Sequence, residues 1–229
     1  MKKKLFVIHG WTYSLEKWQP IQSLLASKGI ELVLLKVPGL TEPSAKVWDM
    51  DGYVAWLHEK IKTQEYPVVI GHSNGGRIAL NYLTKYPGTF SDLILIDSAG
   101  VPHQQPLARL KLGVLRALSK LGRPIAKIPT LKRVVYRVIG AQDYQQAPPN
   151  MKKTMQNMLK ANTTIAFDKI DVPTTLIWGI ADQQTPIADA KFLAKTIPGA
   201  KLNIIQNARH APMFTHPGEV AAIIEEVVR

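Results

Sequence analysis

The chain has 229 residues, of which 46% are hydrophobic and 20% are charged, close to the average for globular proteins. It contains no cysteine, which excludes disulfides, cysteine–zinc sites, iron–sulfur clusters and a cysteine nucleophile. The net charge is +12, and residues 100–165 carry +11 of it, because they hold twelve basic residues and one acidic residue. Localised positive charge attracts anionic partners, while a solvated face of charged helices explains the pattern equally well.

The amino-terminal residues do not predict a targeting or membrane segment. Residues 1–4 are Met-Lys-Lys-Lys, but the apolar run that follows covers only residues 5–8 before His9 and Gly10 end it. No other stretch has the length of apolar sequence that crosses a bilayer. We therefore expect a cytoplasmic protein without a transmembrane segment.

Short apolar runs alternate with longer amphipathic stretches along most of the chain. The alternation predicts an α/β fold with a mostly parallel, doubly wound sheet of about six strands. The predicted strands are 4–9, 31–37, 68–71, 92–97, 174–179 and 201–206, and the predicted helices are about 17–28, 50–63, 75–86, 187–196 and 217–228. Two helix starts are marked by a capping residue before proline, at Thr185-Pro186 and His216-Pro217.

Residues 100–165 interrupt this alternation. Apolar residues at helical spacing predict three helices, within 107–121, 131–139 and 151–159, and no strand. We therefore expect a helical lid at 100–165, inserted into a core made by residues 1–99 and 166–229.

The strongest local pattern is the run Gly-His-Ser-Asn-Gly-Gly at residues 71–76, between a predicted strand and a predicted helix. A G-x-S-x-G turn in this position is typical of a nucleophile elbow, which exposes the serine hydroxyl at the carboxyl end of the sheet. The glycines are needed because the turn is sharp and neighbouring chain passes close to it. Ser73 is the predicted nucleophile, and a glycine-rich turn with a helix-capping serine is the alternative.

A serine nucleophile needs a base, and the base needs an orienting carboxylate. Asp182 follows the predicted strand 174–179, and His210 follows the strand 201–206. Since the carboxyl ends of parallel strands meet at one edge of a sheet, these side chains are expected to converge with Ser73. Asp97, at the carboxyl end of the predicted strand 92–97, is the competing candidate for the acid.

The oxyanion hole needs two backbone N–H donors, one after the nucleophile and one from the loop after the first strand. The predicted donors are the amides of Asn74 and Trp11, with Gly10 permitting a close approach to the substrate oxygen. No H-E-x-x-H or similar histidine spacing occurs. We therefore expect neither a metal nor a cofactor.

These motifs resemble those of the α/β-hydrolase family, and the resemblance extends over the full length of the chain. It rests on His9-Gly10, the elbow at 71–76, Trp178-Gly179 with Asp182, and the region around His210. A serine at the elbow excludes the members that use an aspartate nucleophile. Residues 36–43 depart from the family pattern, with Lys-Val-Pro-Gly-Leu-Thr-Glu-Pro in place of Asp-x-Pro-Gly-x-Gly-x-Ser.

Two segments resemble one branch of this family, the esterases that cleave pimeloyl-acyl-carrier-protein methyl ester. They are His-Gly-Trp at 9–11 with Trp18, and the tail at 210–219, which lactonases and C–C bond hydrolases share. The resemblance to that branch implies a helical lid whose basic residues face an acidic carrier protein.

The function expected from these residues is hydrolysis of carboxylic esters through an acyl-enzyme. A lactonase, an acyl-carrier-protein ester hydrolase and an acyltransferase remain alternatives with related chemistry. An alternative of another class is a non-catalytic binding module that uses the basic segment. That segment holds only two aromatic residues, Tyr136 and Tyr144, so stacking on bases has little support and no nucleic-acid partner is expected.

Overall fold

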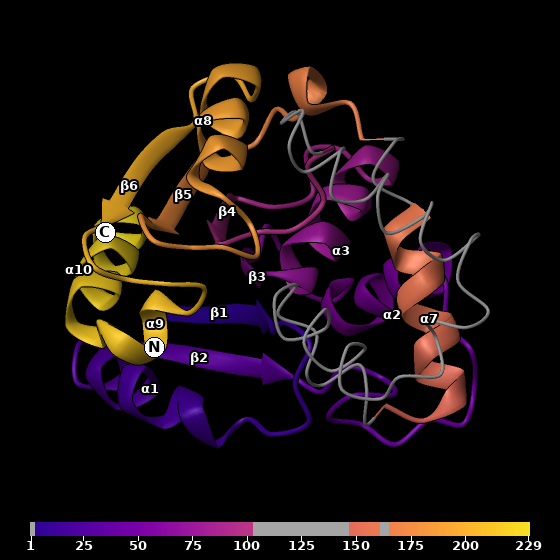
Figure 1. Cartoon of the computed structure of the whole chain (residues 1–229). Helices are drawn as coiled ribbons and strands as arrows, with labels where there is room; N and C mark the ends of the chain where they lie inside the picture. The colour runs from indigo at the N-terminus through magenta and orange to yellow at the C-terminus, as the bar shows by residue number, and fades with distance from the viewer. Residues whose placement is uncertain (1–2, 103–146, 161–164) are drawn as a thin grey trace, which may run out of the picture.

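The computed structural model of the chain describes residues 3–102, 147–160 and 165–229. Within these residues, six strands form one parallel sheet in the order β2-β1-β3-β4-β5-β6 (Figure 1). The strands are β1 (Lys3–Ile8), β2 (Ile30–Leu35), β3 (Val68–His72), β4 (Asp92–Ile96), β5 (Thr174–Gly179) and β6 (Lys201–Ile205). The predicted parallel α/β architecture is confirmed: β5 has the predicted bounds, and the ends of the other strands differ from the predicted ones by at most two residues.

Helices of the described part cover both faces of this sheet. They are α1 (Gln19–Ala26), α2 (Met50–Ile61), α3 (Asn74–Lys85), α7 (Pro149–Lys160), α8 (Ile187–Thr196), α9 (Pro212–Thr215) and α10 (Pro217–Val228), with single 3-10 turns η1 (Glu16–Trp18) and η4 (Phe167–Lys169). No helix among the described residues is long and apolar enough to cross a membrane.

Both faces of each central strand are buried because the helices form two layers. In β1, Leu5 and Val7 pack with α1 and α10, whereas Phe6 and Ile8 pack on the opposite face with α2 and α3. This explains why the central strands are continuous apolar runs rather than alternating ones.

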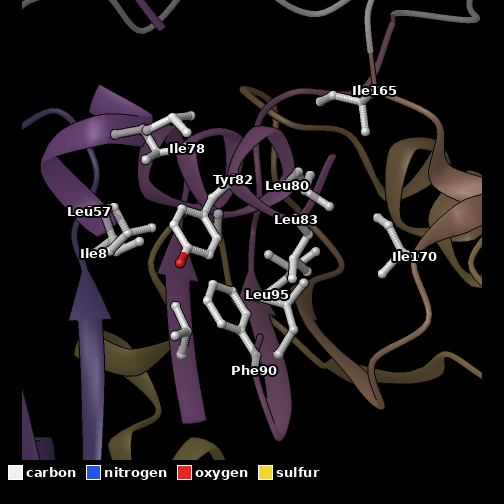
Figure 2. Packing of buried hydrophobic residues seen from close by; sticks show 14 of the residues in the cluster. Ile8, Leu57, Ile78, Leu80, Tyr82, Leu83, Phe90, Leu95, Ile165 and Ile170 are labelled. Atoms are coloured by element: carbon white, nitrogen blue, oxygen red, sulfur yellow. The ribbon is translucent and has the colours of Figure 1, made fainter. Parts of the chain in front are cut away.

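The core beneath α3 is aromatic as well as aliphatic, as Figure 2 shows. The rings of Tyr82 on α3 and Phe90 before β4 stack with centroids 5.1 Å apart. Buried aliphatic side chains from β1, α2 and β4 surround them, including Ile8, Leu57 and Leu95. Because α3 begins directly after Ser73, this packing fixes the elbow relative to the sheet.

The strand order reverses direction at β1, since β2 lies on one side of it and β3 on the other. In parallel α/β sheets, ligands bind outside the carboxyl ends of the strands at such a switch point. The loop after β1 and the elbow after β3 meet there, which places His9, Gly10 and Ser73 at the position where a ligand is expected.

Of the three helices predicted within 100–165, the third is present as α7, and the other two lie outside the described residues. Hydrogen bonds attach α7 to the loop that follows β2. The Trp48 amide donates to Thr154 Oγ1 at 2.9 Å, and the Asn150 side chain donates to the Ser44 carbonyl at 3.0 Å. The Asn157 side chain adds a hydrogen bond to the Trp48 carbonyl.

One of the two predicted helix caps is wrong. Helix α8 begins at Ile187, after Pro186, and no side chain caps it. The Thr185 hydroxyl instead lies against Asp182. The other prediction is confirmed in part: Pro217 is the first residue of α10, although the His216 side chain makes no capping hydrogen bond.

The elbow depends on glycine at three positions because neighbouring atoms leave no space for a side chain there. A Cβ at Gly75 would overlap the Ile8 carbonyl oxygen at the end of β1, and one at Gly76 would overlap the Ser98 side chain. A Cβ at Gly71 would lie 2.6 Å from Gly76 Cα. The sequence pattern is therefore a consequence of packing between α3, β1 and the loop after β4.

Replacing Gly75 by alanine tests this packing. We expect Gly75→Ala to lower the free energy of unfolding by about 3 kcal/mol or more, because the overlap is with backbone that cannot rotate away. Gly218→Ala is the matched control, since nothing lies within 4 Å of its Cβ position in α10. The control should stabilise by about 0.4–1 kcal/mol. Urea unfolding followed by circular dichroism measures both, and equal effects would contradict the steric explanation.

Candidate active site

Ser73 occupies a strained turn between β3 and α3. Its φ of 51° lies in the left-handed region that non-glycine residues rarely adopt. Hydrogen bonds hold this conformation: the Ser73 amide donates to the Ile96 carbonyl, and the Ser73 carbonyl accepts from the amides of Gly76, Arg77 and Ala99. The turn is thus supported from α3 and from both ends of the loop after β4.

Ser73, His210 and Asp182 form one hydrogen-bonded series. Ser73 Oγ lies 2.9 Å from His210 Nε2, and His210 Nδ1 lies 2.8 Å from Asp182 Oδ2. A carboxylate only accepts, so Nδ1 carries the proton and Nε2 is free to accept from the serine hydroxyl. Ser73 is more than 100 positions from the other two residues in sequence, yet the three meet at the carboxyl ends of β3, β5 and β6 in a geometry suited to proton transfer.

Asp182 is buried, yet several donors stabilise its charge. Its Oδ1 accepts the amides of Gln184 and Thr185 at 2.7 and 3.2 Å, and the Thr185 hydroxyl lies 2.6 Å from its Oδ2. Burial raises the pKa of Asp182, but the hydrogen bond and charge of His210, with the donors from Thr185 and Gln184, outweigh it and leave this pKa below its usual value. Asp182 is therefore ionised at neutral pH.

Thr185 is a site residue that the sequence reading missed. Besides Asp182, its hydroxyl lies 3.1 Å from the Asp97 carbonyl oxygen and 3.3 Å from His210 Nδ1. The available signal was the spacing Asp-x-x-Thr, which favours a turn in which aspartate accepts from the following amides. The proline after Thr185 made a helix cap the simpler interpretation.

His72, inside the elbow, positions the loop that carries His210. Its Nε2 donates to the His210 carbonyl at 2.9 Å. Burial, with the neighbouring His210, lowers the pKa of His72 to about 3, so the ring is neutral. The rings of Trp18 and Phe214 pack edge-on around it. His72 therefore has a structural role in supporting the His210 backbone.

The predicted oxyanion donors lie on the two segments that meet at Ser73. The loop after β1 passes so close that a Cβ at Gly10 would lie 2.9 Å from His72 Nδ1 and 3.0 Å from Ser73 Cβ. Asn74 is the first residue of α3, so its amide is one of the helix N–H groups without an intrahelical acceptor. The Asn74 side chain accepts a hydrogen bond from Arg77.

The loop after β2, where the chain departs from the family pattern, contacts the loop after β1. The Thr41 hydroxyl accepts the Val37 amide at 3.0 Å and lies 2.7 Å from His9 Nε2. His9 Nδ1 donates to the Gly10 carbonyl, so Nε2 accepts from Thr41. Burial lowers the pKa of His9, which keeps the ring in this neutral form. Thr41 thereby supports the segment that precedes Trp11.

Asp97, the competing acid, lies beside the series and is fully buried. One of its side-chain atoms lies within 4.8 Å of ligand atoms of both Asp182 and His210. Its Oδ1 accepts the Gly179 amide at 2.9 Å, whereas Oδ2 has no hydrogen-bond partner. It is Asp182, not Asp97, that bonds to His210 Nδ1.

Asp97, Asp182 and His210 also form the cluster of the described residues with spacing suited to a metal ion. Asp182 Oδ2 and His210 Nδ1, however, are already bonded to each other. A cation would have to separate that pair, and Asp97 Oδ2 is the one oxygen of the cluster without a partner. The arrangement therefore fits a proton-transfer site better than a metal centre.

Comparison with known proteins agrees with this architecture. A family model described as the alpha/beta hydrolase fold matches residues 4–217. The chain belongs to the alpha/beta hydrolase family. The sheet order, the elbow after β3 and the histidine after β6 are where the fold of this family places them.

Two curated relatives in this family are named for ester chemistry. The chain is 27% identical to monoacylglycerol lipase ABHD6 of Homo sapiens, over 97% of this chain and 74% of that protein. It is 25% identical to pimeloyl-[acyl-carrier protein] methyl ester esterase of Aromatoleum aromaticum, over 98% of each. Among solved structures, the esterase EaEST of Exiguobacterium antarcticum matches with a TM-score of 0.74 and 18% identity, covering 99% of this chain and 91% of that one.

The role of Thr185 can be tested without altering the three residues of the series. We expect Thr185→Val to slow labelling of Ser73 by a fluorophosphonate about 10- to 100-fold, because a hydrogen bond to a charged group contributes about 1.5–3 kcal/mol. Thr185→Ser keeps the hydroxyl and should retain most of the rate. If valine and serine behave alike, the hydroxyl has no part in orienting His210 through Asp182.

Proposed function

We propose that the protein is a serine hydrolase that cleaves carboxylic esters through an acyl-enzyme, with Ser73, His210 and Asp182 as its catalytic triad. The observation that carries the proposal is the unbroken series Ser73 Oγ–His210 Nε2 and His210 Nδ1–Asp182 Oδ2, at 2.9 and 2.8 Å. The lipase and esterase names of the two curated relatives support the same reaction class.

In the first half of this reaction, His210 Nε2 takes the Ser73 proton as Oγ attacks the ester carbonyl. Asp182 stabilises the imidazolium that forms and holds the Nδ1 proton in place. His210 then gives its proton to the leaving alcohol, and the acyl group remains on Ser73. In the second half, His210 activates a water molecule that releases the acid and restores the serine.

The tetrahedral intermediates need donors for their oxyanion, and the amides of Trp11 and Asn74 are the proposed pair. The proximity of Gly10 to Ser73 and the position of Asn74 at the start of α3 support this assignment. The N-terminus of α3 also contributes its positive end to the developing charge.

The acyl group is proposed to enter under a cap formed by residues 100–165, inserted into a core of residues 1–99 and 166–229. The apolar spacing of the segment favours a medium-length or aromatic acyl chain. Lactones are a second substrate class, because ring opening uses the same attack by Ser73. An acyltransferase reaction differs only in the acceptor, since an alcohol or thiol would then replace water.

Ser73→Ala tests the nucleophile. We expect the variant to lose ester hydrolysis about 10⁴-fold and to lose fluorophosphonate labelling, by analogy with other triads. Ser27→Ala, which removes an exposed hydroxyl at the end of α1, is the matched control and should label normally. A panel of p-nitrophenyl esters of increasing chain length, with homoserine lactones beside them, measures hydrolysis. Retention of a tenth of the activity would exclude Ser73, and an unlabelled parent protein would favour a non-catalytic binding module.

An acidic carrier protein is the proposed partner of the basic segment 100–165. The esterase relative is named for a carrier-protein ester, and the segment carries +11. Raising the salt concentration from 50 to several hundred millimolar should therefore slow turnover of a carrier-linked ester, while turnover of a small neutral ester should barely change.

Five substitutions to glutamine should reproduce the salt effect: Arg109, Arg116, Arg123, Lys132 and Arg133, all of which lie outside the described residues. The small ester serves as the internal control, because the proposed triad is untouched. Equal responses of the two substrates, or no response, would show that the charge of the segment is only a solvated surface.

A further inference from the structure

Arg77 is a buried cation close to the proposed nucleophile, and the proposed reaction gives it no role. It lies in the first turn of α3, four residues after Ser73, and only 5% of its surface is exposed. Burial lowers the pKa of its guanidinium to about 10, so the group remains charged at neutral pH. A buried charge is destabilising unless an opposite charge compensates it, and the position of Arg77 therefore requires an explanation.

No acid compensates this charge among the residues that the structure describes. The guanidinium Nη1 donates to the side-chain oxygen of Asn74, which is a neutral acceptor, and Nε has no partner. None of the ion pairs in the described part includes Arg77. Outside the described residues the sequence contains a single acid, Asp143. The chain therefore offers Arg77 at most one carboxylate.

The position of Arg77 on α3 makes an anion more favourable still. The first N–H groups of a helix have no intrahelical acceptor, and the helix dipole places its positive end there. A cation in the first turn is disfavoured, whereas an anion is favoured. The guanidinium and the positive end of α3 therefore act together directly after Ser73.

Packing fixes the stem of Arg77 and directs its guanidinium. The loop after β4 lies against the stem, since a Cβ at Gly100 would lie 3.3 Å from Arg77 Cα and 3.4 Å from its Cβ. The Arg77 amide donates to the Ser73 carbonyl, and the Arg77 carbonyl accepts from the Asn81 side chain at 2.8 Å. The end of the side chain is bonded to Asn74, the residue that directly follows the proposed nucleophile.

We propose that Arg77 binds a carboxylate at the far end of the acyl group, so that the preferred substrates are monoesters of dicarboxylic acids. This inference rests on the proposed function, because it names the substrate class of the same site. Within the described residues, Asn74 occupies Nη1 and leaves the edge formed by Nε and Nη2 for the ligand. The two oxygens of a carboxylate can accept from the two N–H groups of that edge in parallel.

The carboxylate is assigned to the acyl group because of where the alcohol must lie. His210 Nε2 has to reach the leaving oxygen to protonate it, so the alcohol lies on the His210 side of Ser73. Arg77 is instead bonded to Asn74, whose amide is a proposed donor to the oxyanion formed from the acyl carbonyl. The acyl group is therefore the part of the substrate that extends toward the guanidinium.

The experiment compares charged and neutral acyl groups of equal length. The substrates are the mono-p-nitrophenyl esters of adipic and suberic acid, with p-nitrophenyl hexanoate and octanoate as their neutral counterparts, each corrected for spontaneous hydrolysis. Arg77→Met keeps an unbranched side chain and removes the charge. Lys85→Met is the matched control, because it removes an exposed cation from the last turn of the same helix.

We expect the parent protein to have a higher kcat/KM for a charged ester than for the neutral ester of the same length. Arg77→Met should lower the ratio of these two kcat/KM values about 10- to 100-fold, because a hydrogen-bonded ion pair is lost. Arg77→Lys should retain part of the ratio, since it keeps the charge without the planar fork. Lys85→Met should leave the ratio unchanged.

Three results would overturn the inference. The first is an equal ratio in the parent protein and in Arg77→Met. The second is a dependence on Arg77 of p-carboxyphenyl hexanoate instead, because that ester carries its carboxylate on the alcohol. The third is a loss of unfolding free energy in Arg77→Met that Asp143→Asn reproduces, since Arg77 would then be paired within the chain.

Binding measured without turnover separates this inference from the proposed function. Adipate has a carboxylate at both ends, so it should raise the Tm of the parent protein more than hexanoate does at equal ionic strength, and Arg77→Met should remove the difference. That difference in a protein that hydrolyses no ester would support the anion site and contradict the proposed function. If Arg77→Met does not fold, the parent protein decides, because equal shifts with adipate and hexanoate overturn the inference.

Discussion

The close approach of the first turn of α3 to the end of β1 is the constraint on which the site depends. Gly75 rests against the Ile8 carbonyl, and the loop after β1 lies against Ser73 at Gly10. This contact brings Ser73, the proposed nucleophile, close to a proposed oxyanion donor. The strained backbone of Ser73 costs of order 1–3 kcal/mol, and the hydrogen bonds to its amide and carbonyl make that conformation tolerable.

Three carboxyl groups, those of Asp97, Asp182 and Asp189, are buried in this region. Asp182 is stabilised as an anion by several donors, whereas Asp97 and Asp189 have raised pKa values, about 9 and about 7. Burial raises the pKa of all three groups, and the charge of Asp182 raises it further in Asp97 and Asp189, whereas in Asp182 the charge and hydrogen bond of His210 and the donors from Thr185 and Gln184 outweigh burial. Because Asp182 is ionised and Asp97 is neutral, His210 lies next to a single negative charge.

Contacts away from the proposed triad connect α7 and the segment after β2 with the loop that precedes Trp11. Helix α7 is hydrogen-bonded to the segment around Trp48, and a Cβ at Gly39 would collide with the Met151 side chain of α7. Thr41, two residues after Gly39, supports His9. The segment after β2 is therefore packed between α7 on one side and the loop after β1 on the other.

The pattern of the sequence predicts the parallel α/β architecture, since apolar runs of strand length and amphipathic stretches of helix length are local properties. It also predicts that Ser73, Asp182 and His210 lie at strand ends, because their order along the chain and the elbow pattern can be recognised without knowing the fold. Only the folded chain shows that Thr185 contacts Asp182 instead of capping α8, and that Asp97 lies beside Asp182 and His210. These contacts depend on the distances between side chains from different strands and on how deeply the side chains are buried. The spacing of residues along the chain shows neither quantity.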